Sequence, residues 1–131
     1  MKIRGVDFIV YPVSDLARAA QFYREVLGLR QEIYSDEYQW AEFACGNVTL
    51  ALHGGNKTPV EPGGRRLAFA VDDIAAAYDE LKAAAVRMPG KPEDHGVCRH
   101  LDVFDPDGNP VMLHQRADGT WGQNSPAAGA R

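Results

Sequence analysis

Val13-Ser-Asp-Leu-Ala17 recurs in the second half of the chain as Val71-Asp-Asp-Ile-Ala75, and this repeat decides the fold. Further along each half, Leu50-Ala-Leu-His53 recurs in the same way as Val111-Met-Leu-His114. Two segments that share the order of their motifs are typical of a duplicated structural unit. We therefore expect two modules with the same order of elements, over about residues 3–53 and 64–116.

Each module is expected to contain a strand, a helix and three further strands. In the first module, the apolar and β-branched run 8–13 predicts a strand, with Pro12 near its end or at a sheet edge. Ser14 or Asp15 is expected to cap a helix that continues to about Leu27, and Gly28 to stop it. The remaining strands are predicted at about 30–34, 39–44 and 48–53.

The second module repeats this order. A strand is predicted at 67–71, a helix from 73 to about 85, and strands near Arg87, at 100–104 and at 111–115. The segment 54–64 between the modules is rich in Gly and Pro, which indicates a boundary. Residues 117–131 lack periodicity and are expected to form a loose tail that Trp121 anchors in part.

Composition favours one soluble globular domain over residues 1–116. The 131 residues are 45% apolar and 24% charged, and the net charge of −4 disfavours a nucleic-acid partner. No apolar run approaches the ~20 residues that cross a bilayer, and the N-terminus shows no signal segment. Cys45 and Cys98 are isolated thiols without CxxC spacing, so we expect reduced cysteines and a cytoplasmic location, with no membrane partner.

Three blocks carry a resemblance to a known family: residues 13–29, residues 67–74 and Phe104-Asp-Pro-Asp-Gly-Asn109. Over about residues 3–116 the chain resembles the vicinal-oxygen-chelate superfamily, which includes glyoxalase I, extradiol dioxygenases, fosfomycin-resistance enzymes and bleomycin-binding proteins. The resemblance implies an α+β fold in which tandem βαβββ modules form curved mixed sheets around a cavity. It also implies a small-molecule ligand and a homodimer.

The resemblance further implies four metal-ligand positions, which fall on Phe8, Ala51, Arg66 and Met112. A phenyl ring, a methyl group, a guanidinium and a thioether are poor ligands for the hard or borderline metals that His and carboxylates bind. We therefore expect no metal at these positions and no cofactor.

A displaced metal site remains an alternative. It would use His53 and His114, two residues beyond Ala51 and Met112, because side chains two apart on a strand share a face. Carboxylates would come from Glu42 and Asp102, and such a set suits zinc or iron. This alternative depends on register, because a slip of one residue turns every one of these side chains to the other face.

Without a metal, the same surface would bind a ligand directly. Apolar contacts would come from Phe8, Val10, Trp40, Ala51, Ala68 and Met112, and an anion-binding fork from Arg66. The ligand-binding candidates are therefore Phe8, Trp40, Glu42, His53, Arg66, His100, Asp102, Met112 and His114.

Each candidate also has a purely structural interpretation. Met112 and Trp40 would pack between strands, and Arg66 would pair with Asp72 at the surface. Asp94 and His95 are interpreted as solvated loop residues, and Asp105-Pro-Asp-Gly108 as a turn.

Two main functions follow from this sequence. The first is a metal-independent small-molecule binding protein of the glyoxalase/bleomycin resistance type, which sequesters a ligand in its cavity. The alternative is a lyase- or isomerase-type enzyme that acts on a small oxygenated substrate, through the displaced metal site or through acid–base catalysis by His100, Asp102 and His114. An interaction module that serves a larger enzyme is a third hypothesis.

Overall fold

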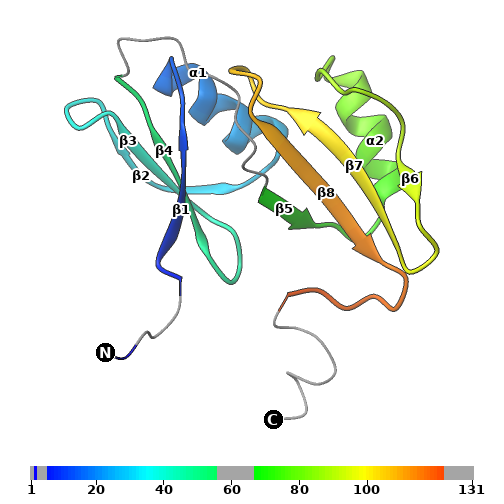
Figure 1. Cartoon of the computed structure of the whole chain (residues 1–131). Coiled ribbons are helices and arrows are strands. Elements are labelled where there is room, and N and C mark those ends of the chain that lie inside the picture. The colour runs from blue at the N-terminus through cyan, green and yellow to red at the C-terminus, as the bar shows by residue number, and fades with distance from the viewer. Residues whose placement is uncertain (1, 3–5, 56–66, 123–131) are drawn as a thin grey trace. The chain divides into compact units, whose positions relative to one another are not determined.

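The computed structural model describes residues 2, 6–55 and 67–122 of the chain. The fold is α+β, and the chain divides into two compact units, Met1–Glu61 and Pro62–Arg131 (Figure 1). Arg66 and most of the predicted boundary segment 54–64 lie outside the described residues.

The first unit is a four-stranded mixed sheet with one helical segment. Its elements are β1 (Phe8–Pro12), α1 (Leu16–Gln21), the π-helix η1 (Phe22–Val26), β2 (Arg30–Ser35), β3 (Trp40–Ala44) and β4 (Thr49–His53). The strand order is β1-β4-β3-β2, with β1 parallel to β4 and the other pairs antiparallel. Pro12 is the last residue of the edge strand β1, as the sequence predicted.

The second unit repeats this topology. Its elements are β5 (Leu67–Ala70), α2 (Ile74–Ala83), β6 (Glu93–Asp94), β7 (Cys98–Phe104) and β8 (Pro110–Arg116). The strand order β5-β8-β7-β6 matches that of the first sheet, and β5 is likewise parallel to β8. The duplicated unit that the repeated motifs predicted is therefore confirmed.

Both helices begin where the sequence predicted, and of the two candidate caps of the first helix, Asp15 and not Ser14 takes that role. The Asp15 carboxylate accepts a hydrogen bond from the Arg18 backbone N–H at 3.1 Å, and Asp73 accepts one from Ala76 at the same distance. Gly28 adopts φ +72°, a left-handed conformation that glycine reaches at little cost, directly after the first helical segment. These contacts fix where each helix starts and where the first one stops.

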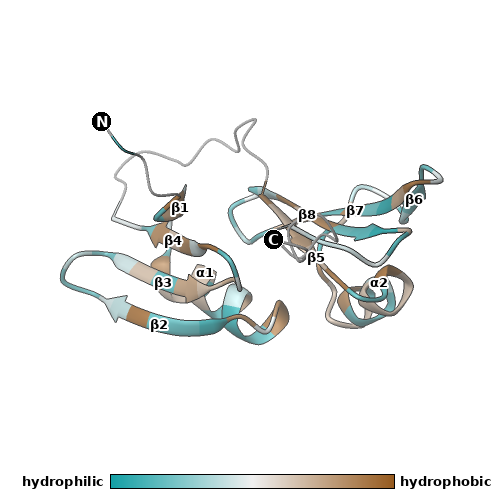
Figure 2. Cartoon of the chain, turned by 90° about the horizontal axis from the view of Figure 1, so that it is seen from below, coloured by the Kyte–Doolittle hydropathy of each residue, from teal (hydrophilic) through white to brown (hydrophobic). Residues whose placement is uncertain are grey.

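In each unit the helix packs on one face of the sheet. α1 contacts β3 and β4, and α2 contacts β7 and β8. In the inner strands, most residues on the helix side are buried and apolar, and their neighbours along the strand point to the opposite face. Figure 2 shows the hydrophobic colouring on the central strand β4 and the hydrophilic colouring on most of the edge strand β2. The buried strand residues on the helix side are Tyr11, Ala41, Phe43, Leu50 and Leu52 in the first unit, and Leu101, Val103, Val111 and Leu113 in the second; Ala51, on the opposite face of β4, is also buried.

Three expectations about the elements are corrected. The strand predicted near Arg87 is absent: Arg87 instead accepts a hydrogen bond from the Phe104 N–H through its carbonyl, and the edge strand β6 forms at Glu93–Asp94. Pro89 and Pro92 lack the N–H that a ladder needs, which accounts for the later start. The first helix becomes a π-helix at Phe22, and Phe69, whose position on a helix-packing face predicts a core residue, is half-buried.

The Asp105–Asn109 segment is a structural turn, as predicted. One Asp105 carboxylate oxygen accepts hydrogen bonds from the backbone N–H groups of Asp107 (2.9 Å) and Asn109 (2.8 Å). The other accepts from the Asn109 side-chain amide at 3.0 Å. Both Asp105 and Asn109 are buried, so this carboxylate organises the connection between β7 and β8.

Residues 117–122, the described part of the C-terminal segment, are hydrogen-bonded to the second unit. The Ala117 N–H donates to the Val97 carbonyl at 2.9 Å, and the Arg116 guanidinium donates to the Thr120 hydroxyl at 3.2 Å. Trp121 is 37% exposed. Among the described residues, no helix is long and apolar enough to cross a bilayer.

Candidate functional site

The first sheet has an open face, on the side away from α1, and it carries every described candidate of the first unit. Alternation along β1 puts Phe8 and Val10 on this face, and the ladder pairs them with Thr49 and Ala51 of β4. On the other side of β4, Trp40 pairs with His53 and Glu42 with Ala51. Phe8, Trp40, Glu42 and His53 therefore share one face of the sheet, so the strands are not shifted by the one residue that would separate them.

Aromatic rings on this open face touch one another across the sheet. Phe8 and Trp40 meet edge to face with ring centroids 5.5 Å apart, and the Trp40 and His53 rings lie at 5.8 Å. The Trp40 indole N–H donates to the Glu42 carboxylate at 2.8 Å. Phe8 is 44% exposed. The face thus combines a partly exposed aromatic surface with one carboxylate that is held in place.

The second sheet has a corresponding open face, away from α2. Ala68 pairs with Met112 and Ala70 with His114, while on the other side of β8 His100 lies opposite His114 and Asp102 opposite Met112. The side chains of His100 and Asp102 are only 16% and 21% exposed. The described candidates of this unit share one face of one sheet.

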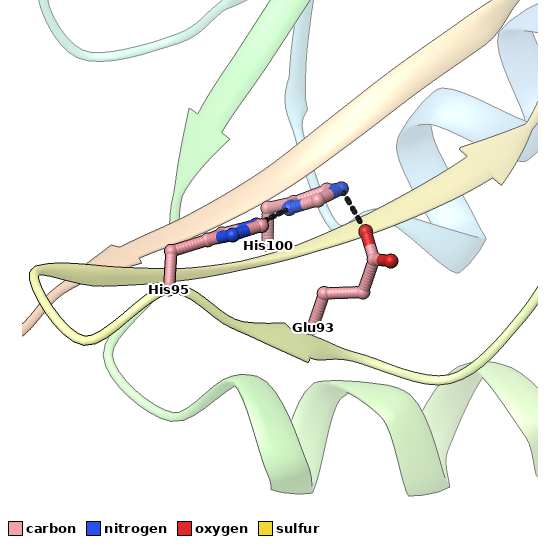
Figure 3. Close-up of side chains that lie close together, drawn as sticks. All are labelled: Glu93, His95 and His100. Atoms are coloured by element: carbon pink, nitrogen blue, oxygen red, sulfur yellow. Dashed lines mark hydrogen bonds and ion pairs between the residues drawn. The ribbon is translucent and has the colours of Figure 1, made fainter.

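His100 is the centre of a polar cluster on this face, which comprises Glu93, His95 and His100 (Figure 3). His100 Nδ1 lies 2.7 Å from His95 Nε2, and the two rings are nearly coplanar, with an angle of 6° between them. On the other side of the same ring, His100 Nε2 lies 3.1 Å from a Glu93 carboxylate oxygen and 3.8 Å from one of Asp102. One imidazole therefore links a carboxylate to a second imidazole.

The sequence interpretation missed two members of this cluster. His95 was interpreted as a solvated loop residue and Glu93 was not a candidate, because the edge strand was expected near Arg87. The structure pairs Glu93 with His100 across the β6–β7 hairpin, and the His95 N–H donates to the Cys98 carbonyl at 2.8 Å to close the turn. Gly96, which lies between His95 and His100 in the sequence, could have indicated this arrangement, because a glycine there is typical of a tight turn that brings the two flanking segments together.

A second carboxylate stabilises the tip of this hairpin. Asp94 accepts a hydrogen bond from the Gly96 backbone N–H at 2.8 Å, and the Arg99 guanidinium lies 3.4 Å from its other oxygen. The Gly96 N–H, followed by the positive charge of Arg99, holds the pKa of Asp94 below its ordinary value. Asp94 and Arg99 lie on the helix side of the sheet, whereas Glu93 and His100 lie on the open face, so this ion pair is separate from the cluster.

The four positions at which the resemblance implies metal ligands do not suit a metal where the structure describes them. Phe8, Ala51 and Met112 lie on the open faces and offer a ring, a methyl group and a thioether. Arg66 is outside the described residues. A metal would have to use other donors of this chain.

A surface hollow of about 380 Å³ lies beside the hairpin tip, away from all the predicted candidates. Its walls combine acidic, basic and neutral groups, so it favours no single class of ligand. The lining residues are Asp94, Gly96, Cys98, Arg99, Gln115, Arg116 and Ala117.

Comparisons with known proteins agree with the fold and add relatives. Residues 5–113 match the family model of the Glyoxalase/Bleomycin resistance protein/Dioxygenase superfamily. A probable lactoylglutathione lyase of Synechocystis sp. is 33% identical over 117 residues, which cover 79% of this chain and 88% of the relative. The metallothiol transferase FosB of Staphylococcus haemolyticus is 29% identical over 118 residues, or 86% and 84% of the two chains.

One solved structure is similar in both sequence and fold. TnmS3, an antibiotic binding protein from Streptomyces sp. CB03234, superposes with a TM-score of 0.75 at 30% identity. The match covers 89% of this chain and 99% of TnmS3. Relatives of this chain thus include both a named binding protein and named enzymes.

The expectation that the chain takes no cofactor is wrong. The relatives include transferases whose name specifies a metal, and Glu93, His95 and His100 of the second unit form a group that could hold a metal ion. Their potential ligand atoms all lie within 4.8 Å of one another. This group forms only through the β6–β7 hairpin, so it coincides neither with the positions that the resemblance implies nor with the displaced set.

Proposed function

Because the chain belongs to the Glyoxalase/Bleomycin resistance protein/Dioxygenase superfamily, we propose that it binds a small organic molecule on the open face of its first sheet. The observation that carries this proposal is the Phe8–Trp40 pair, an edge-to-face contact at 5.5 Å on the face of the sheet opposite α1. Aromatic rings of this kind offer a large apolar contact area to a flat ligand. The similarity to the antibiotic binding protein TnmS3 supports the same activity.

The polar groups beside the rings narrow the chemistry of the ligand. Glu42 accepts the Trp40 indole N–H at 2.8 Å, so its carboxylate is held at the edge of the aromatic surface. A carboxylate beside exposed rings favours a ligand that joins an aromatic or apolar body to a cationic or hydrogen-bond-donating group. The chain's net charge of −4 is compatible with a cationic ligand.

The open face of the second sheet offers a separate set of contacts. Met112 would supply an adaptable apolar contact and His114 a polar one, and both are partly exposed. His100 and Asp102 lie directly across the ladder from them. We assign these four residues to ligand contact or orientation.

A tryptophan-based titration tests the proposal. The chain has two tryptophans, so Trp121→Phe leaves Trp40 as the sole reporter on the open face. We expect saturable quenching by one or more members of a panel of aromatic and cationic antibiotics, small carboxylates and phosphonates. A ligand at a hundred times its Kd should also stabilise the folded protein by about 2.7 kcal/mol, measured as a thermal shift.

Matched substitutions separate this face from the rest of the surface. Phe8→Ala removes the edge-to-face partner from an edge strand and should weaken binding about tenfold, or ~1.4 kcal/mol. Tyr38→Ala removes an aromatic ring that is 73% exposed in the β2–β3 turn of the same unit, and should leave the affinity unchanged. Equal affinity for the Phe8→Ala and the parent protein would contradict the proposed face, and so would a panel without a binder.

A lyase- or isomerase-type activity is the second candidate, favoured by the Glu93–His100–His95 chain of contacts. A carboxylate that fixes one nitrogen of an imidazole leaves the other nitrogen to take up or release a proton. The 33% identity to a probable lactoylglutathione lyase supports chemistry of this class. Turnover of a small oxygenated substrate that is lost in His100→Gln and kept in Tyr38→Ala would favour this candidate over binding alone.

A further inference from the structure

The β6–β7 hairpin brings together donor atoms that neither binding by the aromatic face nor the family's metal positions require. Glu93 and His100 are paired across the hairpin, and the turn between them is closed by the His95 N–H bond to the Cys98 carbonyl at 2.8 Å. Gly96 has φ +84°, and its N–H donates to Asp94 at 2.8 Å. The backbone thus fixes the positions from which both histidine side chains project.

From this arrangement we infer that the hairpin is a binding site for a borderline divalent cation such as Zn²⁺, Ni²⁺ or Cu²⁺. The ligands are His95 Nε2 and His100 Nδ1, which lie 2.7 Å apart. Nitrogens this close share a proton when no ion is bound, and a metal ion replaces that proton. At Zn–N distances of roughly 2.0–2.1 Å, two nitrogens on a tetrahedral ion lie roughly 3.4 Å apart, so the rings must separate by roughly 0.6 Å and tilt until both lone pairs point at the ion.

Glu93 completes the site from behind the His100 ring. Its carboxylate lies 3.1 Å from His100 Nε2, where it accepts the ring N–H and so leaves Nδ1 with the lone pair that a metal needs. A carboxylate behind a ligating histidine is the usual arrangement in metal sites, and its loss commonly weakens affinity by about 10–100-fold. Glu93 is 65% exposed, so its replacement disturbs no packed core.

The local charge favours a cation. The carboxylates of Glu93, Asp94 and Asp102 belong to the two strands of the hairpin, and Arg99 on the same strands is paired with Asp94 at 3.4 Å on the helix side. Across the ladder, β8 contributes His114 opposite His100 and Arg116 opposite Cys98, and the Arg116 guanidinium donates to the Thr120 hydroxyl at 3.2 Å. Imidazole ligands select borderline metals, whereas Mg²⁺ and Ca²⁺ require oxygen ligands.

A bound ion would stabilise the short edge strand β6. β6 has two residues and lies at the edge of its sheet, so few backbone hydrogen bonds hold it. A metal bound by His95 in the turn and His100 in β7 would reduce the opening of this hairpin. Slower amide exchange at residues 93–100 is therefore expected when the ion is bound.

Calorimetric titration of the untagged 131-residue chain with ZnCl₂, NiCl₂, MgCl₂ and CaCl₂ tests the site. We expect one Zn²⁺ or Ni²⁺ per chain and no measurable heat with Mg²⁺ or Ca²⁺. His95→Gln, at an exposed turn position, should abolish stoichiometric binding, and Glu93→Gln should weaken it about tenfold or more. His53→Gln changes a histidine of the other unit and should bind the ion as the parent protein does.

Nitrogen NMR of the imidazoles assigns the ligand atoms. Addition of Zn²⁺ should shift His95 Nε2 and His100 Nδ1 and leave the proton on His100 Nε2. Zn²⁺ binding that survives His95→Gln, that is lost in His53→Gln, or that shifts neither of these nitrogens would overturn the inference, as would the absence of binding. The proposed ligand-binding face is read out separately by Trp40, so failure of either proposal leaves the other standing.

Discussion

At the scale of single residues, Cys45 shows how burial changes the chemistry of a side chain. Its thiol is partly buried after β3, 3.8 Å from the Phe43 carbonyl. Burial raises the pKa of the Cys45 thiol above its ordinary value, and a backbone hydrogen bond involving Leu50 opposes this only in part. The thiol is therefore held in its protonated, unreactive form near neutral pH.

This predicts slow alkylation of Cys45. With Cys98→Ser as the background, Cys45 is the only thiol, and its reaction with iodoacetamide should continue to accelerate above pH 8.5, the approximate ordinary thiol value. Because the folded state favours the protonated form, the free energy of unfolding should fall as the pH rises from the ordinary thiol value through the raised one. A rate that levels off at or below about pH 8.5 would contradict the raised pKa.

Gly54 is a second residue whose identity is set by its surroundings. A Cβ at this position would lie 2.7 Å from Gln39 Oε1 and 3.1 Å from the Leu16 Cβ. The Gly54 N–H also donates to the Gln39 carbonyl at 2.8 Å. The chain therefore leaves β4 through a position that only glycine fits without displacement of its neighbours.

At the scale of elements, the N-terminus of α2 is held by two side chains. Asp73 accepts the Ala76 N–H at 3.1 Å, and the Gln115 side chain of β8 accepts the Ile74 N–H at 2.9 Å. Two of the backbone donors that a helix leaves unpaired are thus satisfied, one of them from the strand on which the helix packs. The cap couples the start of the helix to its sheet.

The cap predicts a measurable loss of stability on substitution. Asp73→Ala should lower the free energy of unfolding by about 1 kcal/mol, measured by urea denaturation, because the Ala76 N–H loses its acceptor. Asp72→Ala removes the same charge one residue earlier and serves as the control. Equal losses in the two variants would show that charge near the helix start, and not the capping hydrogen bond, accounts for the effect.

The first helical segment shows a limit of periodicity. The sequence predicted one regular helix to about Leu27, but the chain forms a π-helix from Phe22 to Val26. The consecutive residues Phe22 and Tyr23 are both buried and meet edge to face at 5.2 Å. The wider π-helical turn accommodates two adjacent aromatic side chains in the core, which an apolar count at three- and four-residue spacing does not predict.

At the scale of the whole molecule, oligomeric state is the main property to test. We expect a homodimer, as the resemblance implies. The edge strand β1 carries apolar side chains at its surface, with Phe8 44% and Val10 40% exposed, and apolar edge strands are prone to association.

Light scattering coupled to size exclusion should therefore give about twice the chain mass of 14.4 kDa. Val10→Lys places a charge on the edge strand and should shift the equilibrium towards the monomer. Tyr38→Lys, at another exposed position of the same unit, should leave the mass unchanged. A monomer mass at every concentration in a dilution series would contradict a dimer.

The sequence by itself determined the duplicated topology, the start of each helix, the Gly28 stop and the Asp105 turn, whereas the structure decided that Asp15 and not Ser14 caps the first helix. Each depends on a repeated motif or on contacts between residues close in the chain, which local composition encodes. The positions that the resemblance implies, together with the two-residue side-chain period of a strand, were sufficient to put Phe8 and His53 on one face of the first sheet and Met112 and His114 on one face of the second. Whether those residues bind a ligand stays a prediction.

Only the tertiary structure decided that Glu93 and His95 meet His100. The sequence placed an edge strand near Arg87, and with that strand no hairpin pairs Glu93 with His100. Side-chain proximity across a hairpin depends on which residues pair and where the turn closes, and both are fixed by hydrogen bonds between separate segments. For this reason the expected ligand positions did not include the group Glu93, His95 and His100. The pairing of β6 with β7 brings these three side chains together.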